Sequence, residues 1–310
     1  MARKDLISNE QVDEFLKENY GYNPKPEDFM LDLMQVAPML LGIPMPMIRY
    51  RGVKKTQAVT LGKAMQKVEG VYHEPFVGSG SSLYRVGKEG KFSKAKASDA
   101  NPKMIDFLQT IKESPQEVSR AFKAISSNLK KPGKALREDI PYLKEIWNEV
   151  KTGNLNKSDE AAANLVLGNY TQMYMPGQIP RFSPGNYIKP TTMANRIEEF
   201  GDILKNVTLE VADWSKSMKN IKPKDFVNLD TPYLGTKTYP GLKPTTAMDH
   251  RSMSNILKEM AEETSGVMYN SPLGATLFDW METKPSGYLR GEEVVGSWGE
   301  GWEKPLLEDY

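Results

Sequence analysis

Residues 68–82, VEGVYHEPFVGSGSS, join a short apolar segment to a glycine-rich turn, and this junction decides the fold class. The apolar part is typical of a short buried strand, and Gly78-Ser79-Gly80 is typical of a tight turn after it. Turns at the carboxyl ends of parallel strands need small residues, so that backbone amides can approach a ligand. The stretch therefore predicts a ligand-binding turn, although a purely structural turn is the alternative while it is taken alone.

The residues that follow indicate a nucleoside-type cofactor. Residues 91–111, KFSKAKASDANPKMIDFLQTI, predict a strand that closes at Ser98-Asp99 and a helix from about residue 101. Asp99 comes roughly twenty residues after the turn, where a carboxylate can accept hydrogen bonds from ribose hydroxyls. No Gly-Lys-Ser/Thr follows the turn, so it is not a P-loop, and it is not a Gly-x-Ser-x-Gly nucleophile elbow. Which nucleoside cofactor binds stays open on these residues.

Further strand patterns occur downstream and extend the sheet. VTLEVAD (207–213), DFVNLD (225–230) and GVMYNS (266–271) are strand-like, and a helical pattern at 250–265 precedes the last of them. Strands that alternate with helices predict a mostly parallel, doubly wound α/β sheet. SGYLRGEEVVGSW (286–298) and EKPLLEDY (303–310) are expected to supply a closing hairpin.

Residues 112–190 have a different pattern, which predicts an insertion. Helical segments at 114–125, 137–150 and 159–170 lead into a long loop rich in Gly, Pro and Tyr at 171–190. Residues 120–137 hold six basic residues and no acid, whereas the last twenty residues hold six acids and one lysine. A basic stretch on a chain of net charge +1 is a candidate phosphate-facing surface. A solvated helix face is the alternative explanation of the charge alone.

Composition excludes several classes of protein. The chain has no cysteine and two histidines, which predicts no disulfide framework and no zinc site. No apolar run approaches the roughly 18 residues that a membrane span needs. The absence of cysteine fits a reducing compartment, so we expect a cytoplasmic protein. Residues 8–19 and 26–41 predict helices in a separate N-terminal extension. His73 is expected to be a packed strand residue, and His250 a cap or surface residue.

FVNLDTPYLG, residues 226–235, contains a candidate catalytic turn, Asp230-Thr231-Pro232-Tyr233. The exocyclic amino group of adenine or cytosine is a poor nucleophile, because its lone pair is delocalised into the ring. The Asp230 carboxylate and the Thr231 carbonyl can accept its two N–H bonds and draw the nitrogen towards a tetrahedral state. Pro232 would stiffen the turn, and Tyr233 would stack on a flipped base. An ordinary β-turn with an exposed tyrosine is the alternative.

In this order, the motifs resemble those of the Dam-like, α-class DNA adenine-N6 methyltransferases. HEPFVGSGSS (73–82) is similar to that family's cofactor motif Glu-Pro-Phe-x-Gly-x-Gly, and ASDANPKMIDFLQ (97–109) is similar to the motif that follows it. IRYRGVKKTQ (48–57) resembles the N-terminal aromatic-x-Gly-Gly-Lys motif. LVLGNYTQMY and RFSPGNYIKP resemble the loop around the target-recognition domain. The segment beside the cofactor adenine corresponds to VADWSKS, and the catalytic turn corresponds to DFVNLDTPYLG. The strand after that turn corresponds to GVMYNSP.

The resemblance implies a Rossmann-like methyltransferase sheet, an S-adenosylmethionine cofactor and double-stranded DNA as the partner. It implies a helical extension at 1–45, a catalytic domain at 46–111 and 191–310, and an inserted, mainly helical target-recognition domain at 112–190. The implied residues are, for catalysis, Asp230, Thr231, Pro232 and Tyr233; for the cofactor, Tyr50, Gly52, Lys54, Glu74, Pro75, Phe76, Gly78, Gly80, Asp99, Asp213 and Trp214; and for DNA, Arg120, Lys123, Lys130, Lys131, Lys134, Arg137, Tyr170 and Arg181.

Three positions depart from the family's pattern and keep other hypotheses open. Val53 replaces a glycine, Thr231 replaces a proline, and SWGEGWEKP (297–305) has acids where lysines would be expected. The main hypothesis is adenine-N6 methylation in a restriction-modification or phage setting. The alternatives are a catalytically lapsed DNA- or protein-binding module and methylation of cytosine N4. The N-terminal extension could dock a protein partner, and the tyrosines of 170–174 could stack on bases or fill the inserted domain.

Overall fold

A computed structural model of the chain describes residues 47–48, 65–131, 136–171, 174, 176–177, 179–182 and 189–231, and the backbone of 266–272, 287–290 and 293–298. Contacts along the chain divide it into two units, Met1–Pro44 and Met45–Tyr310, and every described residue belongs to the second unit. The two expected N-terminal helices, His250 and residues 303–310 lie outside the described residues.

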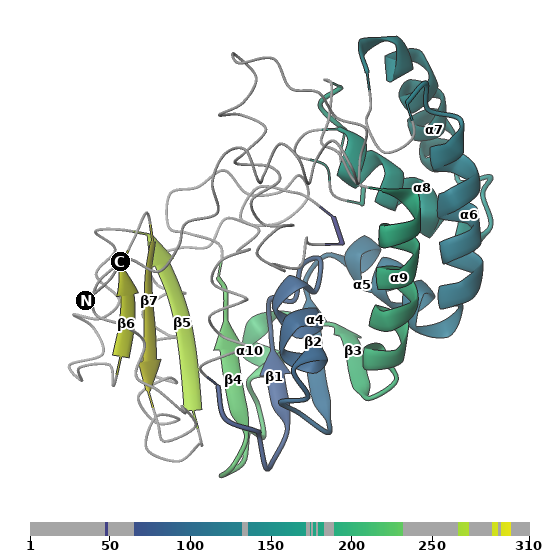
Figure 1. Cartoon of the computed structure of the whole chain (residues 1–310). Helices are drawn as coiled ribbons and strands as arrows, with labels where there is room; N and C mark the ends of the chain where they lie inside the picture. Colours follow the sequence, from purple (N-terminus) through teal and green to yellow (C-terminus); the bar gives the residue numbers. More distant parts are fainter. Residues whose placement is uncertain are drawn as a thin grey trace, which may run out of the picture. The chain divides into compact units, whose positions relative to one another are not determined.

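Seven strands form one sheet in the order β3-β2-β1-β4-β5-β7-β6 (Figure 1). β1 to β5 are parallel to one another, whereas β7 is antiparallel to both β5 and β6. This arrangement confirms the mostly parallel α/β sheet with a closing hairpin. The strand bounds are β1 Tyr72–Glu74, β2 Ala95–Asp99, β3 Val207–Val211, β4 Phe226–Leu229, β5 Gly266–Pro272, β6 Gly287–Arg290 and β7 Glu293–Trp298.

Four helices follow strands or pack near them: α4 Ser81–Lys88, α5 Pro102–Glu113, α9 Pro190–Leu204 and α10 Trp214–Ser217. Asn101 caps α5, because its side chain accepts the Lys103 N–H at 3.1 Å, and Pro102 suits the first helical position. α5 packs on β2 and β3, and α9 packs on β3, α4 and α5. Neither α4 nor α9 was predicted from the sequence.

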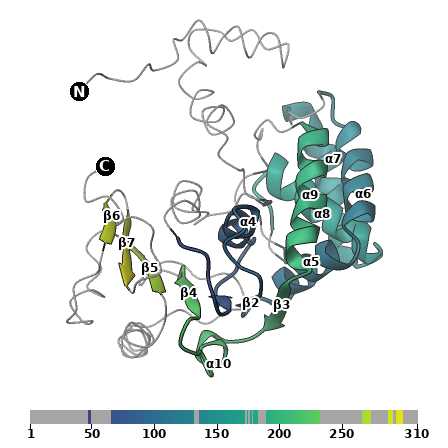
Figure 2. The ribbon, with the colours of Figure 1, turned by 60° about the horizontal axis from the view of Figure 1, so that its bottom comes forward.

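The inserted region contains α6 Pro115–Ser127, the 3-10 turn η1 Arg137–Asp139, α7 Ile140–Thr152 and α8 Lys157–Tyr170. These elements confirm the helices expected at 114–125, 137–150 and 159–170. α6 lies against both α8 and α9, and α7 lies against α8 (Figure 2). Gly201 of α9 permits the close approach of α6, since a Cβ at position 201 would lie 2.5 Å from the Cβ of Pro115, the first residue of α6. The helical group therefore continues past residue 190 into α9.

α8 forms the centre of this helical group. Every residue from Ala161 to Tyr170 is buried, which is the pattern of a core helix rather than a surface helix. The Tyr170 ring is stacked on Phe122, with centroids 6.5 Å apart, and Tyr174 donates a hydrogen bond from its hydroxyl to Asn164. Both tyrosines are 0% exposed, so they fill the domain. The burial of Tyr170 contradicts its predicted contact with DNA, because no face of its ring is open to a ligand.

Candidate active site

The glycine turn lies at the carboxyl end of β1 and leads directly into α4. Its backbone is held to the neighbouring strand, since the Val77 N–H donates to the Ser98 carbonyl at 2.9 Å. Gly78 and Gly80 have φ angles of 48° and 73°, a region that residues with a Cβ rarely adopt. A Cβ at Gly80 would also lie 2.6 Å from the Phe200 Cζ. Both backbone angle and packing therefore require glycine at position 80.

Asp99 ends β2 and is bonded to this turn. Its Oδ2 accepts the Gly78 N–H at 3.0 Å, and its Oδ1 accepts the Asn101 N–H at 2.8 Å. Burial raises the pKa of the Asp99 carboxyl, and the backbone N–H groups of Asn101 and Gly78 act against that rise. Each carboxylate oxygen can accept more than one hydrogen bond, so acceptor capacity remains for a ligand hydroxyl.

Asp213 and Trp214 lie at the end of the next strand, beside Asp99. The Ala212 N–H donates to the Asp99 carbonyl at 3.1 Å, and β3 is parallel to β2. Asp213 caps α10 by accepting the backbone N–H of Ser215 at 3.0 Å and its hydroxyl at 2.7 Å. Ser217 in α10 shares a 2.6 Å hydrogen bond with Ser98, which ties this segment to β2. The residues expected beside the ribose and the adenine thus lie on adjacent strand ends.

The candidate catalytic turn begins where β4 ends. β4 is parallel to β1, with Tyr72 opposite Phe226 and His73 opposite Val227. Asp230 is half-buried, and Thr231 is 3% exposed. Asp230 therefore follows the strand next to the one that carries the glycine turn. Pro232 and Tyr233 lie outside the described residues, as do Tyr50, Gly52, Val53 and Lys54.

Two motif residues beside the glycine turn, Glu74 and Pro75, are buried. Glu74 is 2% exposed and accepts a hydrogen bond from the Tyr72 hydroxyl at 2.9 Å. Burial, the largest cause, and the negative charge of Asp230 raise the pKa of Glu74 to about 8. Phe76 is half-buried. The sequence singled out neither Tyr72 nor Asn228, which is 0% exposed on β4, since a polar residue in a short strand does not reveal its burial.

The opposite end of the same strands holds a second polar group, around His73 and Asp225. The His73 Nε2 lies 2.9 Å from Asp225 Oδ2, and Asp225 also accepts the backbone N–H groups of Val71 and Lys222 at 2.8 and 3.0 Å. Burial lowers the pKa of His73 more than Asp225 raises it, so the neutral imidazole donates to an ionised carboxylate. His73 is confirmed as a packed strand residue.

Most of the predicted DNA-binding residues that the structure describes are exposed. Arg120 and Lys123 are exposed on α6, and Lys130, Lys131 and Arg137 are exposed around the turn before α7. The buried carboxylate of Asp139 holds this turn, since it accepts the Lys130 and Leu136 N–H groups at 2.8 and 2.6 Å. Arg181 is also exposed, and Lys134 lies outside the described residues.

α7 adds a basic edge that the sequence analysis missed. Lys144, Trp147 and Lys151 follow one another three and four residues apart, so they share one edge of the helix. The Lys144 Nζ lies 5.9 Å from the centre of the Phe182 ring, and the Lys151 Nζ lies 5.3 Å from that of Trp147. Both lysines are exposed. The signal that could have found this edge is the helical spacing of the two lysines.

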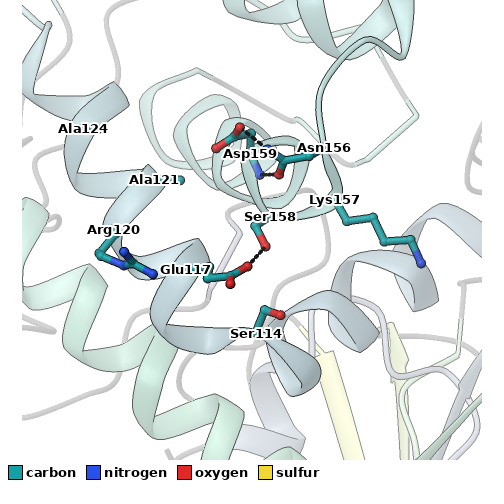
Figure 3. Close-up of a pocket in the computed structure, with 9 residues that line it drawn as sticks. All are labelled: Ser114, Glu117, Arg120, Ala121, Ala124, Asn156, Lys157, Ser158 and Asp159. Atoms are coloured by element: carbon teal, nitrogen blue, oxygen red, sulfur yellow. Dashed lines mark hydrogen bonds between the residues drawn. The ribbon is translucent and has the colours of Figure 1, made fainter.

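A cavity of about 600 Å³ lies between α6 and the start of α8, and Figure 3 shows the residues that line it. Arg120 and Lys157 line it, but so do Glu117 and Asp159, and the Ser158 hydroxyl donates to Glu117 at 3.0 Å. Acids and bases therefore balance in this cavity, which is not a preferred anion site. In the described part of the chain, no three His, Cys, Asp or Glu side chains are grouped as metal ligands, and no helix is long and apolar enough to cross a membrane.

Comparison with known proteins gives one broad match and several weak ones. A family model, D12 class N6 adenine-specific DNA methyltransferase, matches residues 50–289. The Type II methyltransferase M1.LlaDCHI of Lactococcus lactis subsp. cremoris is 21% identical over 199 residues, which cover 61% of this chain and 66% of the relative, just under two thirds.

Two solved structures illustrate a low level of similarity. The rRNA methyltransferase aviRa from Streptomyces viridochromogenes has a TM-score of 0.31 and 13% identity, with 79% of this chain and 82% of that chain covered. A conserved hypothetical protein of Streptococcus pyogenes has a TM-score of 0.30 and 11% identity, with 78% and 90% covered. Similarities of this size carry no argument, so the fold assignment rests on the sheet order.

Proposed function

Because the chain belongs to the D12 class of N6 adenine-specific DNA methyltransferases, we propose that it transfers a methyl group from S-adenosylmethionine to N6 of a flipped adenine in DNA. The observation that carries the proposal is the position of Asp230 at the end of β4, beside the strand that bears the glycine turn. In parallel sheets, ligands bind beyond the carboxyl ends of such neighbouring strands. The Type II relative supports a restriction-modification setting.

The described residues fit the proposed cofactor. Gly78 and Gly80 leave the turn without a Cβ, so a ligand can approach its backbone. Asp99, anchored by two backbone N–H groups, would accept the ribose hydroxyls, and Asp213 and Trp214 would lie beside the adenine. When bound, S-adenosylmethionine supplies an electrophilic methyl group on a sulfonium. Tyr50, Gly52, Lys54, Pro75 and Phe76 are proposed on the resemblance alone.

The catalytic turn would act on the amino group of the target adenine. The Asp230 carboxylate and the Thr231 carbonyl accept its two N–H bonds, which draws the nitrogen lone pair out of the ring. The N6 nitrogen would then be nucleophilic enough to take the methyl group that bound S-adenosylmethionine supplies, and the extra proton on N6 would leave to solvent. Tyr233 would stack on the flipped base, and Pro232 would stiffen the turn. Thr231 retains the carbonyl that this step needs.

The inserted helices would hold the DNA backbone. Exposed Arg120, Lys123, Lys130, Lys131, Arg137 and Arg181 offer positive charge for phosphates, and Lys134 is proposed from the sequence alone. Tyr170 is not part of the proposal, because it is buried. A protein partner for the N-terminal extension and a cytoplasmic location stay predictions. No described residue favours the alternative of a catalytically lapsed DNA- or protein-binding module.

Labelled methyl transfer from S-adenosylmethionine to unmethylated DNA tests the proposal, with the full chain and with Asp230→Ala. The wild-type chain should label DNA, and Asp230→Ala should lose at least about a hundredfold in rate, as removal of one preorganised charge-stabilising group does. Asp202→Ala is the matched control, since this exposed aspartate of α9 pairs only with Lys205 in the described structure. Label that survives Asp230→Ala at the wild-type rate would rule out the proposed turn.

A further inference from the structure

Two serine hydroxyls join the strand end that carries Asp99 to the short helix α10. Ser98, which precedes Asp99 in β2, is 4% exposed, and its Oγ lies 2.6 Å from the Oγ of Ser217 in α10. The Ser217 hydroxyl also donates to the Asp213 carbonyl at 3.1 Å. The Ser98 Oγ lies 3.4 Å from the Pro75 carbonyl, in the segment that leads to the glycine turn. This pair of hydroxyls therefore contacts three segments of the proposed cofactor site.

The protons of the two hydroxyls can be arranged in two ways that keep the bond between them. A serine hydroxyl donates one hydrogen bond and also accepts. In one arrangement, Ser98 donates to Ser217, whose own proton goes to the Asp213 carbonyl. In the other, Ser217 donates to Ser98, whose proton goes to the Pro75 carbonyl. The bond between the serines is made in both arrangements, and the first has the shorter bond to a carbonyl.

α10 is too short to fix its own position. It has four residues, Trp214–Ser217, and a helix of this length gains little stability from its own backbone bonds. The Ala212 N–H, which donates to the Asp99 carbonyl at 3.1 Å, holds the start of the segment, and the buried Met218 holds its end. Between these two ends, the Ser217 hydroxyl reaches β2. The position of α10 therefore depends on such contacts with the sheet.

The start of α10 carries the side chains that are proposed for the cofactor adenine. Asp213 is exposed, and Trp214 is half-buried. Asp213 caps the helix through its bonds to Ser215, and Trp214 is the first residue of the helix. A shift of α10 away from β2 would therefore carry both side chains away from Asp99, the residue proposed for the ribose.

We propose that Ser98 and Ser217 are positioning residues for the adenosine part of the cofactor. Their hydroxyls hold α10 against the end of β2, which keeps Trp214 in place for the adenine relative to Asp99 at the ribose. Without this bond, cofactor binding has to order α10 as well, and that cost lowers the affinity. The role rests on the proposed function, because it requires S-adenosylmethionine as the ligand, and it lies outside the methyl-transfer step itself.

Isothermal titration calorimetry on the full chain tests this role without any methyl transfer. The two ligands are S-adenosylhomocysteine and methylthioadenosine, which lacks the amino-acid part. Ser217→Ala should weaken the binding of both by the same factor, about two- to tenfold, since it removes one neutral hydrogen bond and both ligands carry the adenosine. Ser217→Thr keeps the hydroxyl and should restore most of the lost affinity. Lys216→Ala on the same helix, which breaks an exposed ion pair with Glu210, is the matched control and should bind as wild type does.

A double-mutant cycle tests whether the two serines act through their shared bond. Ser98→Ala, alone or combined with Ser217→Ala, should bind both ligands about as weakly as Ser217→Ala does, because each single variant already lacks the bond. Losses that add in the double variant overturn the positioning role, as does wild-type affinity in Ser217→Ala or a Ser217→Thr chain that binds no better than Ser217→Ala. If Ser98→Ala does not fold, the comparison of Ser217→Ala with Ser217→Thr decides alone.

The same titrations separate this inference from the proposed function. A wild-type chain that binds both ligands but methylates no DNA contradicts the proposed function, and the variants still decide the role of the serines. A loss of affinity for S-adenosylhomocysteine without one for methylthioadenosine overturns the assignment to the adenosine part. A wild-type chain that binds neither ligand overturns both the cofactor and the positioning role.

Discussion

At the scale of single residues, Asp99 links the structure of the site to its proposed ligand. The same carboxylate holds the glycine turn through Gly78 and the start of α5 through Asn101. Its position is therefore set by two backbone N–H groups before any ligand binds. This preorganisation explains why a residue that the sequence singled out for ribose binding is also a structural link between β1 and β2.

Asp99→Ala should weaken the binding of S-adenosylmethionine by about ten- to a hundredfold, because hydrogen bonds to a charged group are each worth about 1.5–3 kcal/mol. Isothermal titration calorimetry on the full chain measures the change. Asp99→Asn should lose less, since its amide oxygen can still accept one backbone N–H. Equal cofactor affinity in wild type and Asp99→Ala would remove Asp99 from the binding site.

His73 makes a prediction about acid stability. Burial depresses its pKa below the ordinary value of 6.5, so the unfolded chain takes up a proton at a higher pH than the folded chain. The stability contribution of His73 is present above pH 6.5 and is lost as pH falls through the folded-state pKa. Denaturant titrations between pH 7 and 5 should show a smaller loss for His73→Gln than for wild type. His250→Gln, the chain's other histidine, is the control; an unchanged slope in His73→Gln would contradict the buried neutral imidazole.

At the scale of elements, strand ends could be predicted from the sequence far better than helix packing. β2 ends at Asp99, β4 ends just before Asp230, and β1 leads into the turn at Gly78 and Gly80, so the turn residues and acids in the sequence mark where these strands end. α9 begins directly after a long Gly- and Pro-rich loop, and its role depends on contacts with α5 and α6 that sequence spacing does not contain. The stacking of Tyr170 on Phe122 and the hydrogen bond from the Lys130 N–H to Asp139 also depend on contacts between separate segments. Sequence spacing does not reveal such contacts.

The basic edge of α7 should contribute to DNA affinity. Lys144→Ala combined with Lys151→Ala should weaken binding several-fold and lower the slope of log affinity against log salt by up to about 0.9 for each phosphate that is no longer neutralised. Fluorescence anisotropy over a salt series measures both quantities. Lys205→Ala with Lys216→Ala, two exposed lysines outside the inserted region, should leave the slope unchanged. An unaltered slope in the α7 double variant would exclude this edge from the DNA interface.

At the scale of the whole molecule, the sheet order and the family match both support a methyl-transfer site at the carboxyl ends of neighbouring parallel strands. Three neighbouring strand ends, on β3, β2 and β1, carry the proposed cofactor residues, and β4 carries Asp230 next to them. The helices of the inserted region place basic side chains on the same unit of the chain. Pro232, Tyr233 and the motif around Tyr50 lie outside the described residues, so their roles stay predictions from the sequence.

The most direct test of the central claim is the chemical identity of the methylated base. Unmethylated DNA is incubated with the full chain and S-adenosylmethionine, digested to nucleosides and analysed by mass spectrometry. We expect N6-methyladenine with the wild-type chain and with Asp202→Ala, and at least about a hundredfold less of it with Asp230→Ala. N4-methylcytosine as the product, or N6-methyladenine made equally well by Asp230→Ala, would contradict the account.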